Sequence, residues 1–335
     1  MPFVEISWPS SSLLSFPETN TPFYPSPFKN EYLNQTYDLF MKASTPMSIA
    51  LVYFSFVHFI NPIIRKRQLR LQQKLNEKNG AAAASKRLPA APYGIARTWW
   101  FKLFVILHNV FLCIYSAWTF VGMVYTLRKT AKQYEEYIVD ETHPKLSKMV
   151  QAVCDLDSGI FSDKLPLKNL SYYGFWFYMS KFYEVLDTII ILLKGRPSSL
   201  LQSYHHAGAM MCMWSGIRYR SPPIWIFVVF NSFIHTLMYF YFTLSCLKIR
   251  VPTIFKRILT SMQITQFIVG GSGAIVYVFL KYTNLETGEL QHCLESSTRA
   301  FPLYINVAYL APLTALFGAF YIESYLRKQP VKQKK

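Results

Sequence analysis

The chain has 335 residues, of which 52% are hydrophobic and 17% aromatic, and its formal net charge is +17. Its apolar residues fall in long continuous runs rather than in the short periodic stripes of a soluble core, which predicts an all-α polytopic membrane protein. The positive charge does not indicate nucleic-acid binding, because the basic residues gather in alternate loops between the apolar runs.

Residues 1–45 are rich in serine, proline and aromatic residues and lack the basic start and apolar run of a cleavable signal peptide. We expect them to form an N-terminal lumenal segment, with the first span acting as an uncleaved anchor. A bilayer core of about 30 Å needs about 20 apolar residues of helix. Seven segments qualify: 46–64, 103–127, 172–193, 200–217, 223–247, 258–280 and 302–325. We therefore predict one seven-span membrane domain over residues 46–325.

Basic residues indicate the side of the membrane on which each loop lies. Segment 65–102 holds ten lysines or arginines against Glu77 alone, and we interpret it as a cytosolic basic linker. The turns at 194–196 and 248–257 are also basic, as is the tail, 326–335, so we place them in the cytosol with the C-terminus. The segments assigned to the lumen are 1–45, 128–171, 218–222 and 281–300.

Other features of the lumenal segments agree with this topology. Asn34 and Asn169 begin N-glycosylation sequons there, and we expect a glycan at Asn34. Of five cysteines, only Cys154 and Cys293 lie in loops, and both loops are lumenal, so we predict a disulfide between them. The very short turn at 218–220, with two arginines, is the exception to the charge pattern.

Polar side chains inside the predicted spans share a common depth. Counted from the nearest cytosolic basic residue at about 1.5 Å per helical residue, they lie roughly 9–20 Å below the cytosolic surface. A charge near the bilayer centre costs roughly 2.5–3.5 kcal/mol, so ionisable groups there usually line a cavity and serve a function. Five spans contribute His108, Lys181, Glu184, Asp187, His205, His235, Gln263 and Gln266. We predict that they share one pocket.

Helical spacing places several of these groups on shared faces. Lys181 lies three residues before Glu184, with which it can form an ion pair, and Asn231 lies four residues before His235. Asp187 then needs another partner. A histidine is a candidate, because a carboxylate on one imidazole nitrogen fixes the tautomer of the ring.

Three classes of protein remain open on these residues. Membrane desaturases and hydroxylases hold two iron ions with many histidines, but this chain has seven in total and no pair spaced four apart, so we expect no metal. A seven-span receptor gives no reason for His205, His235 and Asp187 to share a depth. An enzyme that uses an imidazole as its nucleophile does give a reason, because its catalytic groups must meet at one site.

The polar residues also form ordered motifs. They are Leu107-His108-Asn109 with Leu112; Lys181, Glu184, Asp187 and Thr188 as KxxExxDT; Tyr204-His205-His206; Asn231, His235, Met238 and Tyr239 as NxxxHxxMY; and Thr260, Gln263 and Gln266 as TxxQxxQ. Together they resemble the ELO family of fatty-acid elongases over roughly residues 100–270. The resemblance implies a helical barrel around an acyl tunnel in the endoplasmic-reticulum membrane. It also implies condensation of a long-chain acyl-CoA with malonyl-CoA to 3-ketoacyl-CoA, CoA and CO2, with no cofactor.

The resemblance implies roles for single residues. His205 would attack the acyl thioester and form an acyl-imidazole, while Asn231, His235 and Lys181 would stabilise negative charge on the thioester or enolate oxygen. The wider catalytic set adds His206, Asp187, Glu184, His108 and Asn109. Substrate contacts are expected from Gln202, Tyr204, Met238, Tyr239, Gln263 and Gln266, and from a basic rim of Lys194, Arg196, Lys248 and Arg250 that would hold phosphates.

This chain departs from the family's HxxHH box at the first position, which is Gln202. Glutamine forms hydrogen bonds but cannot take a proton at neutral pH, so a mechanism with a base there does not apply. The QxxHH form resembles the subgroup that acts on polyunsaturated chains, and we predict that preference. The expected partners are membrane lipid, ketoacyl and enoyl reductases and a hydroxyacyl dehydratase; a homodimer is left open.

Overall fold

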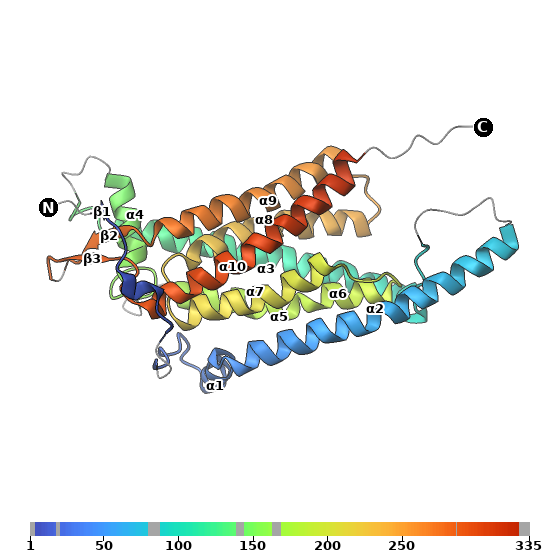
Figure 1. Ribbon diagram of the computed structural model, residues 1–335, viewed down its shortest axis with the longest axis horizontal. Helices are drawn as coiled ribbons and strands as arrows, with labels where there is room; N and C mark the ends of the chain where they lie inside the picture. The colour runs from blue at the N-terminus through green and yellow to red at the C-terminus, as the bar shows by residue number, and fades with distance from the viewer. Residues whose placement is uncertain are drawn as a thin grey trace.

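The long helices of the chain run side by side along one axis of an elongated molecule (Figure 1). The computed structural model describes residues 4–17, 21–79, 88–138, 144–162, 169–285 and 287–327. A small sheet and short helices gather at one end of the molecule, here named the cap end, and helix α10 (Ser297–Tyr321) ends at the opposite end, the tail end (Figure 1). The described parts of the segments assigned to the lumen lie at the cap end, and the described parts of the basic loops lie at the tail end.

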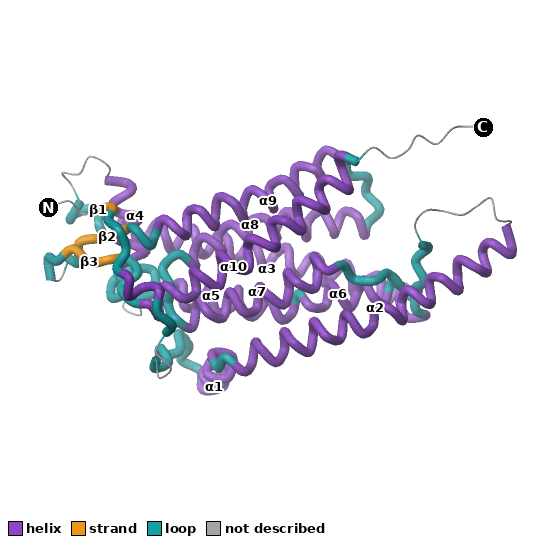
Figure 2. The backbone as a smooth tube through the Cα atoms, viewed as in Figure 1, coloured by secondary structure: helices purple, strands orange, loops and turns teal. Residues whose placement is uncertain are grey.

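Helices occupy all seven segments that the sequence predicts to span the membrane (Figure 2). They are α2 (Ser44–Asn79), α3 (Trp99–Lys132), α5 (Leu170–Tyr183) with α6 (Val185–Leu193), α7 (Leu200–Arg218), α8 (Ile224–Cys246), α9 (Thr253–Val276) and α10 (Ser297–Tyr321), continued by the π-helical η4 (Ile322–Leu326). Within the described residues, α2, α3, α8 and α10 with η4 are long and apolar enough to cross a membrane. The chain is therefore a polytopic membrane protein.

The predicted third span, 172–193, is not one continuous helix. Helical hydrogen bonding stops at Glu184, between α5 and α6, where the N–H of Asp187 donates to the carbonyl of Glu184 only three residues earlier, at 3.0 Å. The hydroxyl of Ser180 lies at the break, within hydrogen-bond distance of both the Phe177 carbonyl and the Glu184 carboxylate, at 2.8 and 2.9 Å. The break therefore lies within the KxxExxDT motif.

The basic segment 65–102 is also more helical than its interpretation as a linker suggests. Helix α2 continues through it to Asn79, because residues 65–79 contain no glycine or proline and many good helix formers. A short 3-10 helix, η3 (Gly94–Arg97), then leads into α3. The alanine-rich stretch at 80–87 and the basic tail at 328–335 lie outside the described residues.

The cap end corrects the all-α prediction, because it contains a three-stranded antiparallel sheet. Strand β1 (Val4–Ile6) pairs with β2 (Leu280–Thr283), which in turn pairs with β3 (Leu290–His292). The 3-10 helix η1 (Ser11–Leu14) and the helices α1 (Glu31–Met41) and α4 (Pro144–Cys154) complete the cap. The sheet thus joins the start of the chain to the loop between α9 and α10.

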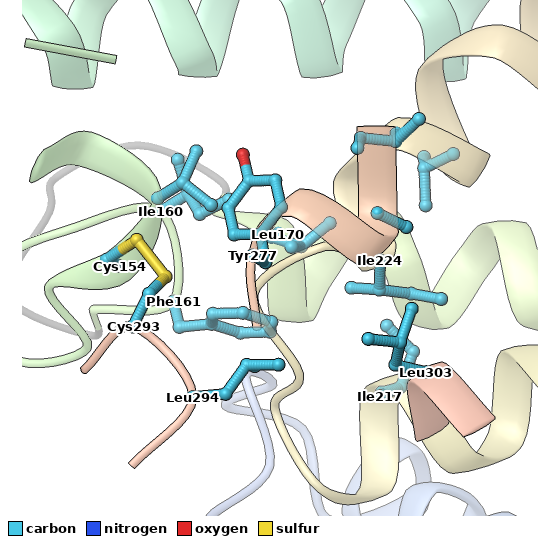
Figure 3. Packing of buried hydrophobic residues seen from close by; sticks show 14 of the residues in the cluster. Cys154, Ile160, Phe161, Leu170, Ile217, Ile224, Tyr277, Cys293, Leu294 and Leu303 are labelled. Atoms are coloured by element: carbon cyan, nitrogen blue, oxygen red, sulfur yellow. A yellow bond between two sulfur atoms is a disulfide. The ribbon is translucent and has the colours of Figure 1, made fainter. Parts of the chain in front are cut away.

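The predicted disulfide between Cys154 and Cys293 is confirmed and joins the end of α4 to the residue after β3. It lies in the buried core of the cap beside Phe161 (Figure 3). Nearby, the hydroxyl of Tyr134 donates to Asp155 at 3.1 Å, and burial together with this carboxylate raises the pKa of Tyr134. The cap is therefore held by a covalent bond as well as by packing.

The two arginines that break the predicted charge pattern are stabilised by contacts with the N-terminal segment. The guanidinium of Arg218 donates to the carbonyls of residues 21–22 and lies 4.1 Å from the ring centroid of Phe23. Arg220 lies 4.4 Å from the ring centroid of Tyr24. Carbonyl acceptors and aromatic faces compensate both cations at the cap end, which explains why this turn tolerates them.

The two sequons differ in accessibility. Asn169 is buried at the N-terminus of α5, where its side chain accepts from the N–H of Tyr172 and donates to the carbonyl of Ser162. A glycan cannot be attached to this amide in the folded protein. Asn34 lies half-buried on α1.

Candidate active site

A cavity of about 570 Å³ lies in the half of the bundle nearer the tail end. Side chains from α3, α6, α7, α8, α9 and α10 line it, and exposed Lys194 and Ser199 mark where it reaches the surface. Predicted site residues in its lining are Asn109, Asp187, Lys194, Gln202, His205, His206, Asn231, His235, Met238, Gln263 and Gln266. Polar groups from distant parts of the chain therefore share one space.

Some predicted site residues lie behind the cavity wall or away from it. Lys181 and Glu184 are buried behind Asn231, and His108 and Tyr239 are buried behind Asp187. The remaining ones are Tyr204, which packs on Tyr309, and the basic residues Arg196, Lys248 and Arg250, which are exposed at the tail end outside the lining.

The carboxylate of Asp187 is held on both oxygens. His108 of α3 donates from Nε2 to Oδ1 at 2.8 Å, and Tyr239 of α8 donates to Oδ2 at 2.6 Å. The imidazole partner expected for Asp187 is thus His108. Because a carboxylate only accepts, both neighbours must present a proton to it, and the aspartate ties α3, α6 and α8 together at the edge of the cavity.

The predicted ion pair between Lys181 and Glu184 is formed, with Nζ 2.7 Å from Oε1. Lys181 also donates to Oδ1 of Asn231 at 3.1 Å, and Nδ1 of His235 lies 3.7 Å from Oε1 of Glu184. Both charged side chains are nearly inaccessible, so each compensates the other in a low-dielectric site. Since the oxygen of Asn231 faces Lys181, its amide nitrogen can donate into the cavity.

The adjacent histidines on α7 have different surroundings. His206 is buried, and its Nε2 lies 2.8 Å from the amide nitrogen of Gln202, four residues earlier. Nδ1 of His205 instead lies 2.9 Å from the hydroxyl of Tyr309 on α10. The ring centroids of His205 and His235 are 6.3 Å apart, and both rings line the cavity. A carbonyl group can therefore lie between them.

The motif glutamines on α9 lie opposite α8. The amide of Gln263 lies 3.7 Å from the sulfur of Met238, and Oε1 of Gln266 is buried with no hydrogen-bond partner among the described residues. The residues that the sequence did not single out include three aromatic side chains of α10: Phe317 and Phe320 in the lining, and Tyr309. Their one sequence signal was an aromatic repeat on an apolar helix, which is also typical of any membrane span.

Within the part of the chain that the structure describes, no group of three or more histidine, cysteine, aspartate or glutamate side chains is placed to hold a metal ion. The three cysteines outside the disulfide, Cys113, Cys212 and Cys246, are free thiols. The cavity thus offers imidazoles, amides, the carboxylate of Asp187, the ammonium group of Lys194, the thiol of Cys246 and the hydroxyls of Ser199 and Ser245 as its chemical groups.

Comparison with known proteins decides the family. Residues 39–333 match the model described as ELO: GNS1/SUR4 family. The chain belongs to the ELO family. Its relatives include fatty acid elongase A of Dictyostelium discoideum, 29% identical over 233 residues that cover 69% of this chain and 75% of the relative. A putative fatty acid elongase of the same organism is 34% identical over 232 residues, covering 68% and 67%.

A further relative, fatty acid elongase 2 of Trypanosoma brucei brucei, is 30% identical over 234 residues, covering 68% of this chain and 77% of its own length. No solved structure matches this chain. The ELO family match includes every residue that lines the cavity, whereas β1 and η1 of the cap precede it. The candidate site therefore belongs to the part of the chain that is shared with the ELO family.

Proposed function

We propose that this chain is a fatty acid elongase that condenses a long-chain acyl-CoA with malonyl-CoA to give 3-ketoacyl-CoA, CoA and CO2. Membership of the ELO family and relatives that are named fatty acid elongases support this reaction class. The observation that carries the proposal is the pair His205 and His235, which face one cavity with ring centroids 6.3 Å apart.

In the first step, Nε2 of His205 attacks the carbonyl carbon of the acyl thioester. A carbon–nitrogen bond forms, the carbon–sulfur bond breaks, and CoA leaves as the thiolate. The amide of Asn231 is suited to donate to the oxyanion, because Lys181 polarises it from behind at 3.1 Å. A fixed donor in a dry site needs no reorganisation as the charge develops.

In the second step, malonyl-CoA loses CO2 and the resulting enolate carbon attacks the acyl-imidazole. A carbon–carbon bond forms, and the electron pair of the breaking carbon–nitrogen bond returns to His205. Asn231 and His235 can hold the enolate oxygen. The product is a 3-ketoacyl-CoA two carbons longer than the acyl substrate.

His206 does not act as the nucleophile in this reaction but lies beside His205, which does. Its Nε2 is occupied by the amide of Gln202, so it has no free lone pair at that nitrogen for attack on a thioester. Gln202 thus donates a structural hydrogen bond to His206. We propose a preference for polyunsaturated chains on the QxxHH pattern, which products from a host fed different fatty acids would test.

The tail end supplies the place for coenzyme A. Lys194 lies at the cavity mouth, and Arg196, Lys248 and Arg250 are exposed at the same end of the molecule, where their cations can hold phosphates. Entry from this end corresponds to a cytosolic substrate, so we propose an endoplasmic-reticulum protein with a lumenal N-terminus, seven spans forming a barrel, and a cytosolic C-terminus. Separate reductases and a dehydratase would complete the elongation cycle.

Family membership favours this reading over a seven-span receptor and a metal-dependent desaturase. The purified protein, given labelled malonyl-CoA and a long acyl-CoA, should release CO2 and form a ketoacyl product. Absence of both would reject the elongase. Stoichiometric iron in the pure protein would instead support the desaturase.

Substitution of His205 by alanine should abolish acyl-enzyme formation from labelled acyl-CoA, because the attacking nitrogen is removed. His292→Ala is the matched control, since His292 lies on β3 at the opposite end of the molecule. Full turnover by His205→Ala would remove this residue from the nucleophile role, whatever the overall reaction proves to be.

A further inference from the structure

Tyr309, on α10, belongs to none of the sequence motifs but touches the proposed nucleophile twice. Its hydroxyl lies 2.9 Å from Nδ1 of His205 and 3.0 Å from the backbone carbonyl oxygen of the same residue. The ring of Tyr309 packs on that of Tyr204, with centroids 5.5 Å apart and planes at 24°. One hydroxyl thus bridges the side chain and the backbone of His205.

The protons in these two contacts can be assigned from the chemistry of the groups. A phenol carries one proton, and a carbonyl oxygen can only accept. The Tyr309 proton therefore satisfies the carbonyl, and the second contact requires a proton on Nδ1 of His205. In a neutral imidazole with its proton on Nδ1, the lone pair lies on Nε2. In the described part of the chain, Nε2 of His205 has no hydrogen-bond partner, and the ring lines the cavity.

Gly208 makes this contact possible. A Cβ atom at this position on α7 would lie 2.2 Å from Cε2 and 2.4 Å from Cδ2 of Tyr309. Carbon atoms cannot approach so closely, so any larger residue would push the Tyr309 ring away from His205. The glycine lies one helical turn after His205, on the face that receives the ring.

We propose that Tyr309 is a positioning residue that holds His205 in the tautomer with Nε2 free for attack, and that Gly208 provides the space for it. This inference rests on the proposed condensation. After attack, the ring is an N-acylimidazolium that keeps its Nδ1 proton bonded to Tyr309. The electron pair of the carbon–sulfur bond leaves with CoA, and the later carbon–carbon bond formation returns a pair to Nε2, so no proton needs to leave the ring.

The first test is Tyr309→Phe, which removes the hydroxyl and keeps the ring. Acyl-enzyme formation should slow at least about 10-fold. The upper limit is about 10⁴-fold, which is the loss of rate in a serine protease whose catalytic histidine is held in the wrong tautomer. The KM for acyl-CoA should stay within about twofold, since the ring still fills its place. Tyr304→Phe is the matched control, because Tyr304 lies on the same helix and its hydroxyl, among the residues that the structure describes, bonds the carbonyl of Leu13 alone, at 3.2 Å.

The second readout needs no substrate. In ¹⁵N-histidine-labelled protein, the signals of His205, assigned by their loss in His205→Ala, should report the Nδ1–H tautomer in wild type and an added Nε2–H population in Tyr309→Phe. A wild-type rate in Tyr309→Phe would overturn the proposal, and so would a slow rate with an unchanged His205 spectrum. Failure of the elongase itself would appear differently, as no acyl-enzyme in any variant.

Gly208→Ala is a third test, which displaces Tyr309 without changing the tyrosine itself. It should slow acyl-enzyme formation and shift the His205 tautomer as Tyr309→Phe does. Because both changes act through the same hydroxyl, the double variant should be no more than about twofold slower than the slower single variant. The proposed arrangement would be contradicted if the rate losses of the two single variants multiplied in the double variant. It would also be contradicted by a Gly208→Ala protein with the wild-type rate and the wild-type His205 tautomer.

Discussion

At the scale of single residues, the buried ionisable groups of the site are held by partners from other helices. Asp187 of α6 accepts from His108 of α3 and Tyr239 of α8, and Lys181 of α5 reaches Asn231 of α8. Desolvated charges are costly unless they are paired and hydrogen-bonded. The same contacts that offset this cost also fix the positions of the groups around the cavity.

Lys181→Met should strongly destabilise the protein, because it leaves the buried carboxylate of Glu184 without its cation. Removal of one partner from a buried ion pair costs about 3–5 kcal/mol in unfolding free energy. A lower Tm of the purified protein in detergent would measure this.

The matched control for this change is Lys102→Met, at an exposed position on α3, which should leave the Tm almost unchanged. The double variant Lys181→Met with Glu184→Leu should recover much of the stability but not the activity, since it removes both charges together. A Lys181→Met protein as stable as wild type would show that the ion pair is not needed to compensate Glu184.

The residue pattern predicted much of this site, but not its orientations. Depth along a helix follows from counting residues, so the shared slab of His205, His235 and Asp187 could be predicted. Depth does not fix the rotation of one helix against another. For this reason the sequence could not predict which histidine bonds Asp187. Tyr309 escaped notice because a tyrosine in an aromatic-rich span is typical of ordinary membrane packing.

At the scale of elements, the loop between α6 and α7 is hydrogen-bonded to α2 and to the segment that leads from α2 into α3. We call this set of contacts the clasp. The carbonyl of Gly195 accepts from the side chain of Gln68 at 3.0 Å and from the N–H of Ala91 at 3.1 Å. Asn61 of α2 bonds the backbone of Ser198 in both directions at 2.9 Å. The loop that leads into the histidines of α7 is therefore positioned by α2.

Gly195→Ala should disrupt this clasp. Gly195 has φ +71°, and a Cβ there would lie 2.1 Å from the carbonyl carbon and oxygen of Ala91. The left-handed backbone costs an alanine roughly 1–2 kcal/mol, and displacement of the neighbouring backbone adds to it, so the Tm should fall. Gly94→Ala is the control, because nothing lies within 4 Å of its Cβ position. Equal melting temperatures of the two variants would contradict the clasp.

Loss of the disulfide should weaken the cap. Cys154→Ser and Cys293→Ser each remove the same bond, which closes a loop of 139 residues, and a native disulfide is worth about 2–5 kcal/mol. The two single variants and the double variant should therefore show similar falls in Tm, measured without reductant. Stability losses that add in the double variant would indicate that the thiols, rather than the bond, carry the effect.

Element types were predictable where apolar runs were long, and less so elsewhere. The strand β1 has only three residues, and its partner β2 lies more than 270 residues later in the sequence, so no local pattern predicts the sheet. The interruption at Glu184 contains no glycine or proline, and the hydroxyl of Ser180 forms local hydrogen bonds there. The sheet depends on a long-range pairing, whereas the interruption is accompanied by local side-chain hydrogen bonds.

At the scale of the whole molecule, sidedness can be tested through the sequons. If the cap end is lumenal, the protein made in microsomes should carry one N-linked glycan, at Asn34, because the amide of Asn169 is buried and bonded. Removal by a glycosidase should increase gel mobility, and Asn34→Gln should abolish this shift. Asn169→Gln should keep it, and its loss in that variant would contradict the fold of this region.

The contacts of Arg218 and Arg220 have a consequence for synthesis in the membrane. A turn with two cations would resist transfer across the bilayer and could pull its two helices into the wrong orientation. Its acceptors at residues 21–24 are made first and lie at the same end as the turn. If the cap end is lumenal, acceptors for these cations have already been synthesised when the hairpin of α7 and α8 inserts, so residues 21–24 would favour the correct orientation of two helices that are made much later.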